Sequence, residues 1–160
     1  MQTASRHVGF APVFDENSKV LILGSFPSVK SREIDFYYGH KQNRFWRTLC
    51  GIFHEEIPAD KEGKIAFLKR SGIALWDVII ECDIIGSSDA SVKNAVVADL
   101  SIVFERAKIQ KILLNGTLAY TLFTKQYANC GIPYYKMSST SPANPKFSKV
   151  DWENALYDLR

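Results

Sequence analysis

The sequence predicts an α/β fold in which helices cover both faces of a mainly parallel sheet. Short apolar runs, such as residues 20–23 and 111–114, recur along the chain with the length of buried strands. Segments with helical spacing separate these runs and provide the long crossover connections that parallel strands need. Residues 1–160 fit a single domain of a size that can build a hydrophobic core without disulfides or metals.

The first half of the chain combines two strands with two helices. In order, we expect a strand at 20–23, a helix at 43–53, a helix at Lys61–Arg70, a strand at 73–80 and a loop at 81–91. Gly24 follows the first strand and ends it. Asp60 can cap the first turn of the second helix, and Gly72 can end that helix.

The second half continues the alternation. We expect a long helix at 92–106, a strand at 111–114, a helix from 117 to about 127, a strand at 134–138, a loop at 139–147 and a last helix at 149–159. Asn115 and Gly116 end the third strand, and Thr117 can cap the helix that follows. Ser148 can cap the last helix.

Composition and motifs exclude several classes of protein. The net charge of +3 permits a polyanionic partner, and three scattered cysteines without a CxxC pair exclude a four-cysteine metal site. Phosphate-binding glycine motifs, HExxH and GxSxG are absent. There is no secretion signal or membrane-spanning run. We therefore expect a cytoplasmic protein that uses no metal and no cofactor.

The predicted topology places the chemistry in four loops. Ligands of parallel sheets bind beyond the carboxyl ends of the strands, which selects residues 24–42, 81–91, 115–116 and 139–144. These loops are polar, aromatic and hydroxyl-rich. A tyrosine at 37 or 38 can stack on a base, and the amides of Asn43 and Asn115 can hold a water or a base edge. On spacing alone, rim packing, a helix cap and an ordinary turn explain the same residues equally well.

Taken in order, the loops resemble a known family. Residues 24–28, Gly-Ser-Phe-Pro-Ser, followed by Tyr-Tyr-Gly-His-x-x-Asn-Arg-Phe-Trp at 37–46, resemble the first motif region of the uracil-DNA glycosylase superfamily. The segment Ser-Thr-Ser-Pro-Ala-Asn at 139–144 is similar to the second motif of its hypoxanthine-DNA (deoxyinosine) glycosylase branch, and Asn115 lies where that branch has a base-facing asparagine. The resemblance covers nearly the whole chain.

This resemblance implies a three-layer α/β/α sandwich around a four-stranded, mainly parallel central sheet. It also implies a monomeric, monofunctional enzyme of base excision repair that hydrolyses the N-glycosidic bond of a flipped, deaminated base in double-stranded DNA. Asn43 matches the catalytic asparagine, Tyr38 the aromatic residue that stacks on the base, and Asn115 the base-recognition residue. The implied substrate-binding residues are Gly24, Ser25, Phe26, Pro27, Tyr38 and Asn115; the implied DNA-binding residues are Ser28, Ser139, Thr140, Ser141, Pro142 and Asn144.

One departure from the family concerns the attacking water. Many relatives place Asp or Asn at the third position of the first motif to hold this water, whereas Phe26 stands there and cannot do so. The role then passes to Asn43. Three alternatives stay open: a mismatch-type uracil-DNA glycosylase, a non-catalytic flavodoxin-like module that binds a nucleotide, and a hydrolase of free nucleosides.

Overall fold

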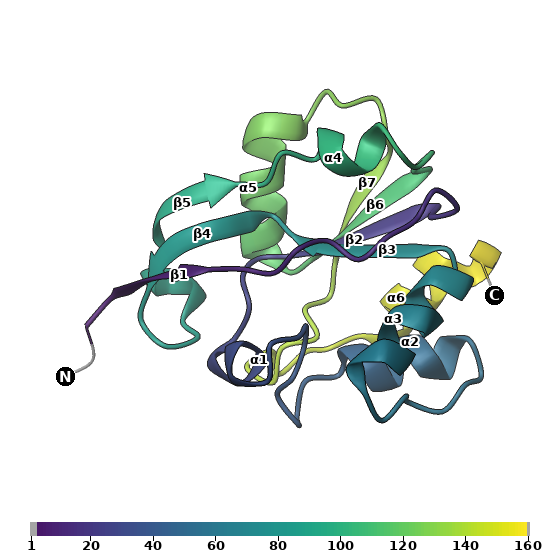
Figure 1. Ribbon diagram of the computed structural model, residues 1–160, viewed down its shortest axis with the longest axis horizontal. Coiled ribbons are helices and arrows are strands. Elements are labelled where there is room, and N and C mark those ends of the chain that lie inside the picture. Colours follow the sequence, from purple (N-terminus) through teal and green to yellow (C-terminus); the bar gives the residue numbers. More distant parts are fainter. Residues whose placement is uncertain (1–2, 160) are drawn as a thin grey trace.

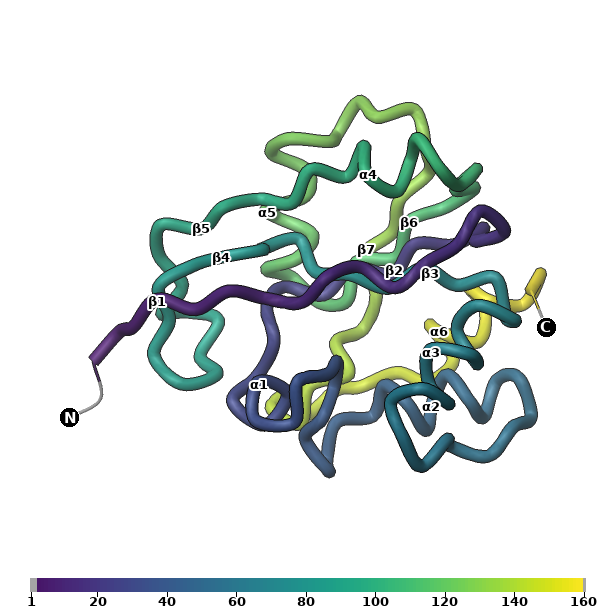
Figure 2. Tube along the Cα trace, in the orientation of Figure 1, coloured from purple at the N-terminus to yellow at the C-terminus, as the bar shows by residue number. Residues whose placement is uncertain are grey.

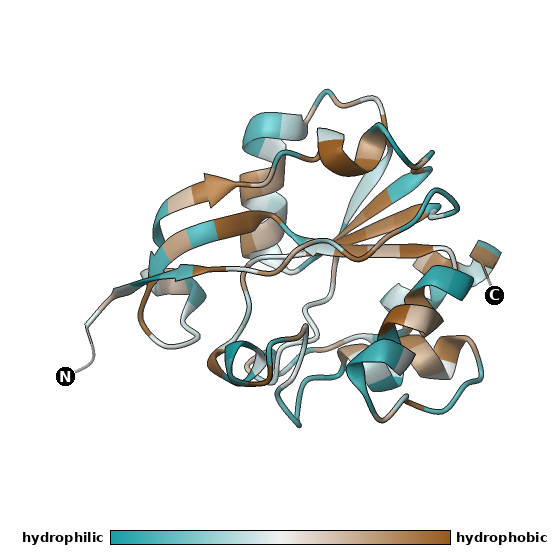
Figure 3. Cartoon of the chain, in the orientation of Figure 1, coloured by the Kyte–Doolittle hydropathy of each residue, from teal (hydrophilic) through white to brown (hydrophobic). Residues whose placement is uncertain are grey.

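A parallel sheet of four strands forms the centre of the computed structural model, which describes residues 3–159 (Figure 1). The strands, in spatial order, are β3 Ile73–Asp77, β2 Val20–Gly24, β6 Lys111–Asn115 and β7 Tyr134–Met137. All residues of β2 and β3 are buried. Continuous apolar strands of this kind are expected when helices cover both faces of the sheet, and these strands are among the most hydrophobic segments in Figure 3.

Helices pack on the two faces of this sheet. They are α1 Val29–Ile34, α2 Phe45–Ile52, α3 Lys61–Arg70, α4 Ser101–Phe104, α5 Thr117–Tyr127 and α6 Lys149–Leu156, with single 3₁₀ turns η1 Asp89–Ser91 and η2 Tyr157–Leu159. Helix α5 contacts β6 and β7, α3 contacts β3, and α2 contacts α6. Figure 1 shows α5 on one side of the sheet and α2, α3 and α6 on the other. The predicted α/β architecture is confirmed.

A second, antiparallel sheet was not predicted. Its strands are β1 Ser5–Val8, β4 Ile79–Ile84 and β5 Lys93–Val97, in the order β1-β4-β5. The apolar run 73–80 is not one strand, because it divides at Val78 into β3 of the parallel sheet and β4 of the antiparallel sheet. The tube in Figure 2 follows this path from one sheet into the other.

Two sequence predictions are therefore wrong. Residues 81–84 belong to β4 rather than to a loop, and the expected helix at 92–106 is β5 followed by the four-residue helix α4. Val92 and Ala95 pack against a small second core made of Ile79, Cys82 and Ile84. Tertiary pairing with β4 outweighs the weak helical preference of this segment. Helix α1, which Ser28 caps, was also not predicted.

The ends of the remaining elements follow from local hydrogen bonds. Asp60 accepts from the Gly63 N–H at 2.7 Å and Ser148 from the Asp151 N–H at 3.3 Å, so both predicted caps are confirmed. Thr117 is not the cap of α5, because Gly116 occupies that position with a φ of +98°. Helix α2 begins at Phe45, two residues later than expected. Within the described residues, no helix has the length and apolar character needed to cross a membrane.

Candidate active site

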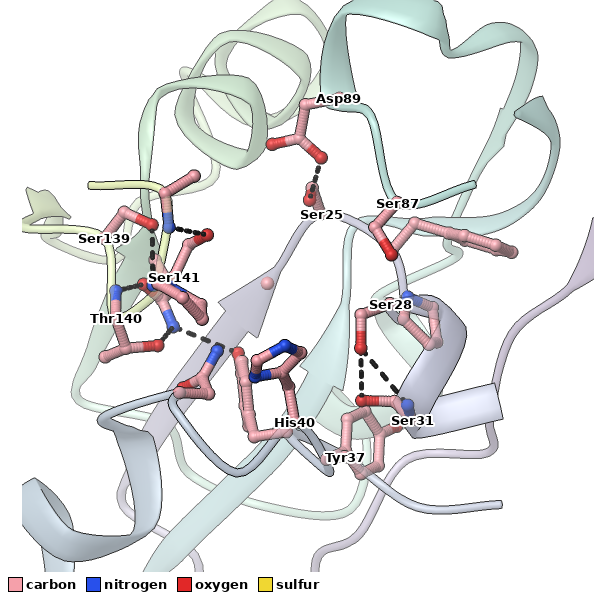
Figure 4. A pocket seen from close by; sticks show the side chains of 18 of the residues that line it. Ser25, Ser28, Ser31, Tyr37, His40, Ser87, Asp89, Ser139, Thr140 and Ser141 are labelled. Atoms are coloured by element: carbon pink, nitrogen blue, oxygen red, sulfur yellow. Dashed lines mark hydrogen bonds between the residues drawn. The ribbon is translucent and has the colours of Figure 1, made fainter. Parts of the chain in front are cut away.

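The four predicted loops meet at the carboxyl edge of the parallel sheet and enclose a pocket of about 560 Å³. Ligand pockets commonly have about 300–1,000 Å³. Figure 4 shows Ser139, Thr140 and Ser141 on one side, Ser28 and Ser31 on the other, and His40 between them. The predicted residues that line this pocket are Gly24, Ser25, Phe26, Pro27, Ser28, Tyr38, Asn43, Asn115, Ser139, Thr140, Ser141 and Pro142. Asn144 is outside the lining.

Asn43 both supports the local backbone and faces the pocket. Its Oδ1 accepts a hydrogen bond from the Phe45 N–H at 2.9 Å, which satisfies one of the free donors in the first turn of α2. Its Nδ2 has no partner among residues 3–159, and Oδ1 keeps a second lone pair. Asn43 therefore offers a donor and an acceptor on a rigid support.

The two neighbouring tyrosines have different surroundings. Tyr37 is buried, and its hydroxyl donates to the Ala11 carbonyl oxygen at 2.8 Å. Tyr38 has a φ of +54°, and its ring stacks on Phe45 with 4.1 Å between centroids and 18° between planes. Burial raises the pKa of the Tyr38 phenol, which therefore stays neutral. Phe45 supports one face of the Tyr38 ring, so an aromatic surface is fixed in the lining of the pocket.

The side-chain amide of Asn115 is engaged by its own protein. Its Oδ1 accepts from the Thr140 N–H at 3.0 Å, while Nδ2 donates to Thr140 Oγ1 at 3.0 Å and to the Tyr38 hydroxyl at 3.2 Å. Both Nδ2 hydrogens therefore have partners. Asn115 fixes the loop after β7 and the tyrosine ring relative to the end of β6.

The loop 139–144 is held mainly by Arg44. The Arg44 guanidinium donates to the carbonyl oxygens of Ser141 at 3.2 Å and Asn144 at 3.0 Å, and the Arg44 backbone N–H donates to Thr140 O at 3.0 Å. The Asn144 side chain donates to the Ser139 carbonyl oxygen at 2.9 Å. Asn144 thus braces the loop from behind, and the serines and Pro142 face the pocket.

The hydroxyls on the opposite wall also have structural partners. Ser28 Oγ accepts from the Ser31 N–H at 3.1 Å and thereby caps α1. Ser25 Oγ donates to Asp89 Oδ1 at 3.3 Å (Figure 4). Phe26 lies under the Arg32 guanidinium, 5.8 Å from its ring centroid. The Phe26 side chain has no polar group that could hold a water, as the sequence indicated.

Sequence reasoning left one central residue of the pocket outside the predicted site, because its carboxyl could equally be an acid or a loop or cap residue. Asp77, the last residue of β3, lines the pocket and is 5% exposed. Burial, and secondarily the charge of Asp89, raises its pKa from 3.8 to about 7. The available sequence signal was a single carboxyl side chain inside the apolar run 73–80, because the predicted strand did not end at this residue. In the described chain, no three His, Cys, Asp or Glu side chains gather as a metal site would require.

Gly24 leaves the space into which these groups project. A Cβ atom at this position would lie 2.6 Å from Asp77 Oδ1 and 2.7 Å from the Tyr38 hydroxyl. Both distances are too short for non-bonded contacts. The absence of a side chain at the end of β2 therefore allows the carboxyl and the phenol to approach the same point.

Comparisons with known proteins agree with this geometry. The model of the Uracil DNA glycosylase superfamily matches residues 11–160. A protein of Methanosarcina acetivorans named Hypoxanthine DNA glycosylase is 35% identical over 150 residues, which cover 91% of this chain and 94% of that protein. One of the same name from Methanosarcina barkeri is 38% identical over 110 residues, 68% of this chain and 70% of the other. A solution NMR structure of a Methanosarcina acetivorans protein, described as a candidate uracil DNA glycosylase, has a TM-score of 0.86 at 32% identity, with coverage of 97% of this chain and 99% of that one.

Proposed function

The chain belongs to the uracil DNA glycosylase superfamily, and we propose that it is a monofunctional glycosylase that removes hypoxanthine from double-stranded DNA. The observation that supports this most is the meeting of Asn43, Tyr38 and the loop 139–142 around one pocket. Relatives that share most of the chain bear the name Hypoxanthine DNA glycosylase, and this favours hypoxanthine over other deaminated bases.

The first step is eversion of the damaged nucleotide. Leaving the stack costs a few kcal/mol, and least where the base is mispaired, as hypoxanthine is opposite thymine. The loop 139–142 enters the vacated space, and its hydroxyls and backbone N–H groups contact phosphate oxygens. Arg44 and Asn115 hold this loop in place before DNA arrives. Tyr38, supported from behind by Phe45, stacks on the everted base.

The second step is hydrolysis at the sugar. The glycosidic bond breaks with its electron pair leaving on the base, and the sugar becomes oxocarbenium-like, as in other glycoside cleavage. Asn43 orients the attacking water through the free lone pair of Oδ1 and its unpartnered Nδ2. Since an amide is not a base, its part is to position the water at a strongly electrophilic carbon.

The third requirement is stabilisation of the departing base, which gains negative charge. Preorganised donors in a pocket closed from water supply this stabilisation. The backbone N–H groups around the pocket and the neutral hydroxyls are the available donors. Asn115 keeps its predicted role at the base edge only if the base displaces one of the bonds from Nδ2 to Thr140 or Tyr38.

Single-turnover assays on duplexes that contain hypoxanthine, uracil or xanthine test the proposal. We expect an abasic product from the hypoxanthine duplex, with the fastest rate among the three. Excision of uracil alone would instead identify a mismatch-type enzyme. Release of base from free inosine would indicate a nucleoside hydrolase, and tight binding without any product would indicate a non-catalytic module.

The proposal also covers the oligomeric state of the protein and its location in the cell. We propose that residues 1–160 act as one glycosylase domain, whose loops line a single pocket, and that the protein is a monomer. The cytoplasm is the proposed location, because Cys50, Cys82 and Cys130 are free thiols, as is usual in a reducing compartment. Sedimentation of the protein alone and with an inosine duplex tests the monomer, and binding that weakens steeply with salt tests the phosphate contacts.

A further inference from the structure

Asp77 is a buried carboxyl group that the proposed hydrolysis does not use. No residue of the described chain donates a hydrogen bond to its side chain. The amide of Asn115, which lines the same pocket, differs in that nearly all its polar atoms are hydrogen-bonded. Buried polar groups normally have partners. A carboxyl that lines a ligand pocket and lacks a protein partner is therefore positioned to bond to the ligand.

The charges around Asp77 favour its neutral form. The pocket contains few other titratable groups, which are Tyr37, Tyr38 and His40 from the loop between α1 and α2, and Asp89 from η1. No lysine or arginine occurs among the residues that line the pocket. The charge of Asp89 opposes ionisation of Asp77, and the two tyrosines are neutral phenols whose pKa values burial raises. His40 is the one histidine among the residues that line the pocket.

A neutral carboxyl matches the edge that deamination creates. Hypoxanthine, uracil and xanthine each carry a ring N–H beside a carbonyl oxygen. A protonated carboxyl donates through its O–H and accepts through its C=O, so it can bond to both atoms at once. An ionised carboxylate accepts only, and it would face the carbonyl oxygen of the base with like charge.

We propose that Asp77 is a further catalytic residue of this site: it holds its proton in the working enzyme and forms this pair of hydrogen bonds with the everted base. The donated bond strengthens as negative charge develops on the departing base, so that Asp77 stabilises the transition state more than the bound substrate. The location supports this role, since Asp77 Oδ1 and the Tyr38 hydroxyl both approach the point beside Gly24. The inference rests on the glycosylase function proposed above.

The pH dependence of excision tests the inference. Single-turnover rates on the inosine duplex should fall about tenfold for each pH unit above neutrality in the wild type, because Asp77 loses its proton. In Asp77→Asn the amide donates and accepts in the same geometry at every pH. This variant should retain excision, with a level rate from about pH 6 to about pH 9. Asp77→Ala should lose about 10²–10³ in rate.

Two matched variants separate Asp77 from its neighbours. Asp89→Asn should keep the fall in rate but move it to lower pH, since the charge that opposes ionisation of Asp77 is gone. His40→Gln should leave the fall in place. The inference is overturned if the fall disappears in His40→Gln and persists in Asp77→Asn, if Asp77→Asn is inactive at every pH, or if Asp77→Ala excises at the wild-type rate.

Binding of free hypoxanthine distinguishes a failure of the inference from a failure of the proposed function. Calorimetric affinity for the base should weaken above neutral pH in the wild type and stay level in Asp77→Asn. If the wild type excises no damaged base and still shows this contrast, the glycosylase proposal and the catalytic role of Asp77 fail, and only its hydrogen bonds to the base stand. If excision occurs and both proteins bind hypoxanthine with the same pH profile, only the assignment of Asp77 fails.

Discussion

The proposed chemistry of this pocket depends on single amide and carboxyl groups, and Asn43 is the first to test. Asn43→Ala should lower the single-turnover excision rate by about 10²–10³, because a positioned polar group is lost from the reacting centre. Binding to an inosine duplex should be retained, since the phosphate contacts come from other residues. A quench experiment gives the rate, and fluorescence anisotropy gives the affinity.

Asn43→Ala also loses the hydrogen bond from the Phe45 N–H to Oδ1, and a typical hydrogen bond contributes about 1 kcal/mol to stability. Asn43→Ser provides the control, because a serine hydroxyl can accept from the same backbone N–H two residues on but has no amide. Both variants should lose excision, and only the alanine variant should lose stability in urea. Wild-type rates in either variant would show that another group positions the water.

Gly24 tests how closely the groups of the pocket are packed. In Gly24→Ala the new methyl group would lie 2.6 Å from Asp77 Oδ1 and 2.7 Å from the Tyr38 hydroxyl. We expect a loss of stability of about 1–3 kcal/mol, typical of overpacking, together with loss of excision. Urea unfolding and single-turnover assays measure the two effects.

Gly51 is the matched control for this substitution. It lies in α2, is exposed, and a Cβ atom there would meet nothing within 4 Å. Gly51→Ala should raise stability by roughly 0.5–1 kcal/mol through helix propensity and leave excision unchanged. Equal effects of the two substitutions would show that the space beside Gly24 has no special importance.

At the scale of elements, Asn115 ties the end of β6 to the loop 139–144. Asn115→Ala would leave the N–H of Thr140, which is 1% exposed, without its acceptor. A buried unsatisfied donor costs about 1–3 kcal/mol, which urea unfolding can measure. Asn129→Ala, at an exposed position after α5, should stay within about 0.5 kcal/mol of the wild type. An equally small change in both variants would mean that the loop does not depend on Asn115.

Local sequence predicted the centre of the parallel sheet well because β2, β3 and most of β6 are buried on both faces and read as continuous apolar runs. The antiparallel sheet escaped prediction for a physical reason. The run 73–80 contains no breaking residue at Val78, where the chain passes from one sheet to the other, and β5 is stabilised mainly by pairing with β4. Such pairing is a tertiary effect that no local pattern encodes.

The candidate site was also predictable from the sequence only in part. Asn43, Tyr38 and the loop 139–142 could be placed from their motifs and from the rule for parallel sheets, and all of them line the pocket. Asp77 could not be identified in this way. Its burial and its missing partners depend on how β3, η1 and the loop between α1 and α2 pack together.

At the scale of the whole molecule, the ionisation of Asp77 affects the free energy of unfolding. Its pKa is about 7 in the folded protein, against 3.8 for the ordinary group. Below about pH 4 the folded and unfolded chains both hold this proton, so the residue has no pH-dependent effect. Between about pH 4 and pH 7 the unfolded chain ionises first, so this group makes folding less favourable as pH rises. The full difference corresponds to about 4 kcal/mol and is reached above about pH 7.

Asp77→Asn removes this titration and should therefore be more stable than the wild type by an amount that grows from about pH 4 to about pH 7 and then stays constant. Urea unfolding of both proteins across this range measures the difference. Asp83→Asn should instead differ from the wild type by a constant amount across this range, because hydrogen bonds from Asn94 and Arg6 lower the pKa of Asp83 and the stabilisation from its ionised form is lost only below about pH 4. Parallel curves for Asp77→Asn and the wild type would mean that Asp77 is ionised inside the fold, and the neutral carboxyl at the base edge would then be lost as well. Keeping the proton on Asp77 would thus lower the stability of the protein at neutral pH and favour release of the base. Such a loss of stability is usual where a site is preorganised for its function.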